Sequence, residues 1–174
     1  MGSAIALLLA FSLRQIEAPP QPDLSLVLRC GEQPNGLALS IQNSGQTDTA
    51  VLIGIALANG RWYLPRELVV DLRRSGSPEV EQLVYQGPTG VAGRIDHWVV
   101  ALPVRATFTV RLRSTDFVST TLPTVATPPA ELTVRLTGRP ITSDLNMDMT
   151  GMKAWRLWTG SARSNTVRLS DCSP

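Results

Sequence analysis

Apolar and polar residues alternate along most of the chain from residue 24 onward. The apolar side of segment 106–113 consists of Ala106, Phe108, Val110 and Leu112, and that of segment 131–137 consists of Leu132, Val134 and Leu136. Thr, Arg and Glu residues occupy the other side of both segments. Successive side chains of a strand point to opposite faces. This spacing therefore predicts strands of antiparallel sheets that have one face in the core and the other in water.

Four more segments alternate in the same way, namely 24–30, 37–41, 68–72 and 98–102. Segment 50–57 differs because it is apolar at every position except Gly54, which is typical of a central, covered strand. The Asn59-Gly60 pair favours a tight hairpin that leads into a return strand over 61–64. Further turns are predicted at 34–36, 75–78 and 87–90, and a short turn of helix near 114–117.

About eight to ten short strands, separated by Gly- and Pro-rich turns, predict an all-β fold of the antiparallel β-sandwich type. No helical periodicity persists over twelve or more residues beyond the N-terminal segment. The Thr- and Pro-rich stretch 120–129 is interpreted as a long crossover or a small linker. Residues 23–174 are therefore expected to form one domain.

Three pieces of sequence extend this prediction. Segment 39–45, LSIQNSG, is a strand followed by an Asn-x-Gly turn; segment 102–108, LPVRATF, is a loop that leads into an alternating strand; and segment 158–167 has the pattern of a closing hairpin. In this order of parts, residues 24–172 resemble secreted bacterial immunoglobulin-like β-sandwich proteins of unknown function. The resemblance is one of architecture: it implies an immunoglobulin-like sandwich and transfers no functional residues.

Residues 1–22 are interpreted as a signal-like segment followed by a Pro-rich leader. An apolar run over 4–13 precedes Pro19, Pro20 and Pro22. The run has the length of a signal-peptide core and is too short to span a bilayer, so no transmembrane span is predicted. The cleavage site stays open, as does the alternative that this segment packs on the domain as a strand. The expected location is secreted, periplasmic or on the cell surface.

The two cysteines agree with an oxidising compartment. Cys30 lies near the start of the expected domain and Cys172 near the end of the chain. A disulfide between them would join the first and last strands and stabilise the fold by roughly 5 kcal/mol in the chain-entropy treatment. The alternative is two unpaired, buried thiols.

Charge and residue counts exclude several classes of function. The 16 basic side chains nearly balance 14 acidic ones, so we expect no nucleic-acid partner. His97 is the single histidine, and the sequence contains no Gly-x-Ser-x-Gly nucleophile motif. We therefore expect no catalytic residues, no metal site and no cofactor, and interpret the protein as a non-enzyme.

Two segments are candidates for binding a partner. The loop 86–98 contains Arg94, His97 and Trp98, and the expected hairpin 143–158 contains Trp155 and Trp158. Exposed tryptophans are common contacts for sugar rings and for protein partners. The basic residues include 15 arginines, and the outward-facing ones would form a basic stripe if their strands were neighbours. This stripe would comprise Arg111, Arg113, Arg135, Arg156 and Arg168.

The resulting hypothesis is a non-catalytic, exported module that binds a protein or a glycan, a second copy of itself included. The alternative is a structural subunit of the cell surface that self-assembles by exchange of its N-terminal strand. An enzyme would require pairs of acidic residues that meet in space without a sequence signal.

Overall fold

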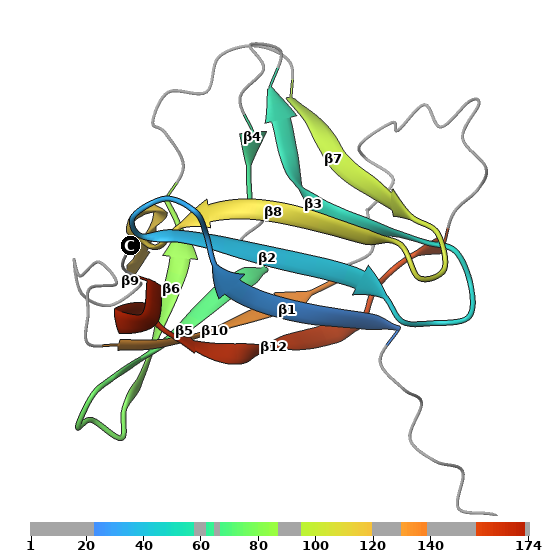
Figure 1. The fold of residues 1–174 in the computed structure, drawn as a ribbon. Helices are drawn as coiled ribbons and strands as arrows, with labels where there is room; N and C mark the ends of the chain where they lie inside the picture. Colours follow the sequence, from blue (N-terminus) through green and yellow to red (C-terminus); the bar gives the residue numbers. More distant parts are fainter. Residues whose placement is uncertain are drawn as a thin grey trace, which may run out of the picture.

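The computed structural model describes residues 23–57, 62–64, 67–86, 95–119, 130–138 and 156–172. These residues form twelve strands and two short 3-10 helices (Figure 1). The strands are β1 (Leu24–Cys30), β2 (Gly36–Asn43), β3 (Thr49–Leu57), β4 (Trp62–Tyr63), β5 (Leu68–Arg74), β6 (Val80–Tyr85), β7 (Ile95–Leu102), β8 (Thr107–Arg113), β9 (Phe117–Ser119), β10 (Ala130–Thr137), β11 (Arg156–Leu157) and β12 (Ser161–Arg168). The helices are η1 (Ser114–Asp116) and η2 (Leu169–Cys172).

The strands belong to three sheets. One has the order β1-β2-β8, and a five-stranded sheet has the order β12-β10-β5-β6-β9. In the third, β3 pairs with β7 on one side and with β4 and β11 on the other. Every described pair is antiparallel apart from β11 with β3, so the prediction of an all-β fold with antiparallel sheets is confirmed. The strand number exceeds the predicted eight to ten because β4, β9 and β11 are only two or three residues long.

The predicted apolar rows fill one core between the sheets. The rows of β1 and β2 are buried together with those of β5 and β10. These buried side chains are Leu24, Leu26, Leu28, Leu37, Leu39, Ile41, Leu68, Val70, Leu72, Leu132, Val134 and Leu136. Burial of apolar surface at this scale is the main favourable term in folding. Ala106 and Phe108, also predicted to face inward, are only partly buried at the core's edge.

Strand β3 is covered on both faces, as its unbroken apolar sequence predicts. Val51 and Ile53 face the core, and Ala50 and Leu52 are buried as well. The pairing with β7 contains a bulge between Leu52 and Gly54. Gly54 has φ +157°, and a Cβ there would overlap the carbonyl oxygen of Tyr63. The glycine is therefore required by the close approach of β4.

The first and last strands lie side by side and close the corner between two sheets (Figure 1). The side chain of Asn165 on β12 donates to the carbonyl oxygen of Leu28 on β1 at 2.9 Å and accepts from the Leu28 N–H at 2.8 Å. A disulfide joins Cys30 to Cys172, with the two Cα atoms 4.9 Å apart. The predicted bond is confirmed, and it fastens β1 to η2 beyond the end of β12.

The loops at the other end of β1 are organised by a buried side chain. Asn43, 1% exposed, donates to the carbonyl oxygens of Thr47 and Leu102, each at 2.9 Å. Its own side-chain oxygen accepts from the N–H of Gly45 at 3.0 Å. A buried amide satisfied in this way fixes both loops because each lost bond would leave an unpaired polar group.

Several predictions fall outside the described residues: the segment 1–22, the Asn59-Gly60 turn, the turn at 87–90, the stretch 120–129 and most of the hairpin 143–158. Within the described part of the chain, no helix is long and apolar enough to cross a membrane.

Candidate functional site

The tryptophans predicted from sequence lie against the core. Trp158 is 6% exposed, and its backbone N–H donates to the carbonyl oxygen of Ala50 at 2.8 Å. Gly160 permits this position, since a Cβ there would lie 2.9 Å from the indole nitrogen of Trp158. Trp98 packs against the core and meets Phe108 edge to face, with the ring centroids 6.0 Å apart. Trp158 is therefore buried and Trp98 is partly buried, whereas Arg94 and Trp155 lie outside the described residues.

His97 occupies the third position of β7, opposite Ile55 of β3. Both ring nitrogens are buried without a hydrogen-bond partner. Among the described residues, no group of three or more His, Cys, Asp and Glu side chains is placed to hold a metal ion. His97 is thus a partly buried residue within β7.

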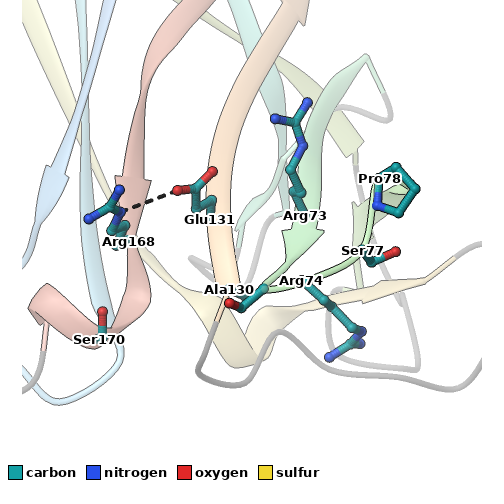
Figure 2. Close-up of a pocket in the computed structure, with 10 residues that line it drawn as sticks. Arg73, Arg74, Ser77, Pro78, Ala130, Glu131, Arg168 and Ser170 are labelled. Atoms are coloured by element: carbon teal, nitrogen blue, oxygen red, sulfur yellow. Dashed lines mark hydrogen bonds and ion pairs between the residues drawn. The ribbon is translucent and has the colours of Figure 1, made fainter.

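A different region has the geometry of a binding site. A cavity of about 520 Å³ lies where β5 turns into β6, beside the start of β10 and the end of β12. The residues that line it, shown in Figure 2, are Arg73, Arg74, Ser75, Gly76, Ser77, Pro78, Ala130, Glu131, Arg168 and Ser170. We call this hollow the arginine cavity.

Strand register brings these residues together. Glu131 on β10 lies opposite Arg73 of β5 on one side and opposite Arg168 of β12 on the other. The neighbouring residue, Ala130, lies opposite Arg74. Because side chains alternate along a strand, Arg73 and Arg74 leave β5 in opposite directions (Figure 2). The cavity therefore has guanidinium groups on more than one side.

The turn from β5 to β6 forms another wall of the cavity. The N–H of Ser77 donates to the carbonyl oxygen of Arg74 at 3.1 Å, and Gly76 has φ +80°. The hydroxyl of Ser77 accepts from the N–H of Glu79 at 3.2 Å. Gly76 fits here because a positive φ is disfavoured for residues with a Cβ. The local sequence Ser-Gly-Ser-Pro thus produces a fixed turn beside two arginines.

The ion pairs of the cavity arginines are exposed at Arg168 and partly buried at Arg74. Arg168 Nε lies 3.2 Å from Glu131 Oε1, and these side chains are 68% and 37% exposed. Arg74 Nη2 lies 3.4 Å from Glu81 Oε2, with side-chain exposures of 39% and 18%. Exposed ion pairs contribute about 0–1 kcal/mol, so an anionic ligand can replace the protein carboxylate at little cost. Arg73 makes no ion pair with any other described residue.

A shallow hollow of about 50 Å³ continues from the cavity across the outer face of the five-stranded sheet. It shares Arg73 and Glu131 with the arginine cavity. Its other lining residues are Asp71, Val80, Thr133, Arg163 and Thr166. The two hollows therefore adjoin along β5, β10 and β12.

Asp71 is the most buried charge in this second hollow, at 8% exposure. Its carboxylate accepts two hydrogen bonds from Arg135, at 2.7 and 2.8 Å, and lies 3.7 Å from Arg163. The hydrogen bond with Asp71 raises the pKa of the Arg135 guanidinium above its ordinary value. Arg135 is thus held by two hydrogen bonds to Asp71, whereas the side chain of Arg163 is 62% exposed to solvent.

The predicted basic stripe is divided between sheets. Arg111 and Arg113 lie on β8, Arg156 on β11, and Arg135 and Arg168 on the five-stranded sheet. Sequence reasoning missed Arg73, Arg74 and Arg163. The available signal was the Arg-Arg pair directly before a Ser-Gly-Ser-Pro turn, which places two cations at the end of a hairpin.

A third hollow, of about 320 Å³, lies beside the turn from β1 to β2. Its charged lining is one glutamate, Glu32, and one arginine, Arg111. The arginine cavity, with three arginines and one glutamate, therefore has more basic side chains than this third hollow. Comparisons with known proteins found no matching family model, no matching curated protein and no matching solved structure.

Proposed function

We propose that the protein is a non-catalytic, exported binding module of the immunoglobulin-like sandwich type. It holds acidic groups of a protein or glycan partner in the arginine cavity. The observation that carries this proposal is a cavity of about 520 Å³ lined by Arg73, Arg74 and Arg168 against the single glutamate Glu131. The Cys30–Cys172 disulfide and the apolar segment 4–13 support export, since disulfides persist in oxidising compartments.

The chemistry of arginine supports an anionic ligand. A guanidinium is planar and always charged, and it presents paired N–H donors that match a carboxylate, sulfate or phosphate group. The arginines project from the hydrogen-bonded strands β5 and β12, so little ordering of the backbone is required when a ligand binds. An incoming anion can take the place of Glu131 at Arg168, because that ion pair is largely exposed.

The test is titration calorimetry with two polyanions, poly-L-glutamate and polygalacturonate, at low ionic strength. We expect both Arg73→Gln and Arg168→Gln to weaken binding about tenfold, the effect of losing one charge-assisted hydrogen bond. Arg113→Gln is the matched control because it removes the same charge from the outer face of another sheet. Equal losses in all three variants, or no binding of either polymer by the unmodified protein, would contradict the proposal.

A further inference from the structure

The arginine cavity and the shallow hollow next to it form one continuous surface. Arg73 and Glu131 line both hollows, which join the end of the five-stranded sheet to its outer face. Arg163 lies at the far side of the second hollow, opposite Arg135 of β10. We call this surface, from Arg168 and Arg73 to Arg163, the arginine track.

The register sets the length of the arginine track. Arg73 pairs across β5–β10 with Glu131, and Arg163 pairs across β10–β12 with Arg135. With about 4.8 Å between strands and about 3.3 Å per residue, the Cα atoms of Arg73 and Arg163 are roughly 16 Å apart. A chain that carries anionic groups along its length can therefore contact Arg73 and Arg163 at the same time, from either end of the shallow hollow that both residues line.

The floor of the track is hydrophilic and contains no open strand edge. The hydroxyls of Thr133 and Thr166 lie 3.0 Å apart. Thr133 is opposite Thr166 on one side and Asp71 on the other, one row along the sheet from Glu131. Strands β5 and β10 are interior strands whose backbone groups are already paired, and β12, the edge strand of this sheet, lies beside β1. A peptide therefore cannot bind here by adding a strand. Hydroxyl and guanidinium groups instead match the hydroxyl and acidic groups of a sugar chain.

We propose that the arginine track binds an extended anionic glycan, one that carries uronate carboxylates or sulfate esters along its length. This inference rests on the proposed function and specifies its ligand. Recognition is by charge and hydrogen bonds, because Trp98 and Trp158 are packed against the core. Arg73 and Arg163 are the contacts along the track, since Arg135 is bonded to Asp71 through both carboxylate oxygens.

Chain length is the first variable of the test. Calorimetry at constant low salt would compare galacturonate, trigalacturonate and hexagalacturonate, with sulfated dextran oligomers for the sulfate ester and unmodified dextran as the neutral control. We expect affinity per molecule to rise from the monomer to the hexamer by at least tenfold. We expect unmodified dextran not to bind.

Arg163 provides the decisive variant. Arg163→Gln should weaken hexagalacturonate binding about tenfold and leave galacturonate binding unchanged. Arg73→Gln should weaken both, and Arg113→Gln, the matched control, should weaken neither. Arg163→Lys, which keeps the charge and loses the paired donors, should give an intermediate loss. Circular dichroism spectra that match the unmodified protein establish that each variant is folded.

The outcomes separate this inference from the proposed function. If chain length and Arg163→Gln have no effect while Arg73→Gln still weakens binding, the arginine track is refuted and the arginine cavity stands. If poly-L-glutamate binds more tightly than galacturonate or sulfated dextran chains of equal charge, the glycan is refuted and an acidic protein is the partner. If no polyanion binds, both proposals fail.

Discussion

Asp71 is the residue whose replacement most directly tests the charge arrangement on the five-stranded sheet. Its carboxylate is 8% exposed and lies between two arginines, at 2.7 and 2.8 Å from Arg135 and at 3.7 Å from Arg163. Arg135 and Arg163 are directly opposite each other across β10 and β12. Asp71→Asn replaces the carboxylate by a neutral amide of nearly the same shape. The negative charge that holds the two arginines beside each other is then absent.

The expected loss of stability is about 2 kcal/mol, the value of hydrogen bonds to a charged group. Removing one partner from a fully buried ion pair costs about 3–5 kcal/mol. The lower figure applies because Arg135 is 36% exposed and remains hydrated. The repulsion of like charges across the strands adds a further few tenths of a kcal/mol, about 0.2–1.

Urea unfolding followed by circular dichroism measures this loss, and Glu131→Gln is the control. The Glu131 pair with Arg168 is exposed, so the control should lose less than about 1 kcal/mol. The same Asp71→Asn protein should bind hexagalacturonate more tightly, since Arg135 is released and a repelling carboxylate is removed. The reasoning is refuted if both variants lose the same stability, or if Asp71→Asn binds the polyanion more weakly.

Other parts of the fold give four further predictions. Asn165→Ala removes both side-chain bonds to β1 and should lower the free energy of unfolding by about 1–3 kcal/mol in urea; no loss would show that β12 and β1 do not depend on it. Replacing Cys30 and Cys172 together by Ala should cost about 2–5 kcal/mol, and a reductant should then leave the midpoint of unfolding unchanged. Gly54→Ala should lower stability in urea more than Gly76→Ala, because both positions have a positive φ but only at position 54 would the Cβ also overlap a backbone atom; equal losses would contradict this. Burial and the charge of Asp116 raise the pKa of Tyr85 in the folded protein. The unfolded chain therefore loses the phenol proton at a lower pH, and the free energy of unfolding should fall as the pH rises above 10.0. Tyr85→Phe should weaken this pH dependence, and an unchanged slope would contradict the assignment.

The sequence predicted those features that depend on local alternation. The Leu and Val rows of β1, β5 and β10 could be recognised because a strand places every second side chain on the same face. The Cys30–Cys172 bond could be predicted because the chain has only these two cysteines. The burial of β3 on both of its faces could be predicted because its sequence is an apolar run.

The arginine cavity could not be predicted in the same way. Arg73, Glu131 and Arg168 are far apart in the sequence and meet only because the strand order is β12-β10-β5. Alternation indicates which face a residue occupies and does not indicate which strand lies beside it. The tryptophans were expected at a binding surface for a related reason: their spacing does not reveal which elements cover them, and Trp158 is buried.

The positions of the two ends of the domain determine how the arginine cavity is presented. Asp23, just before β1, lies beside the Ser44–Gly45 turn, whereas Ser170 and Cys172 lie at the opposite end with the cavity. The eight residues of β12 separate these ends by roughly 25 Å. Attachment of the chain to a support or a fusion partner through its N-terminal side therefore leaves the arginine cavity pointing outward and accessible. The same attachment through the C-terminal side would place the added mass beside the cavity, so affinity reagents made from this domain should be immobilised from the N-terminal side.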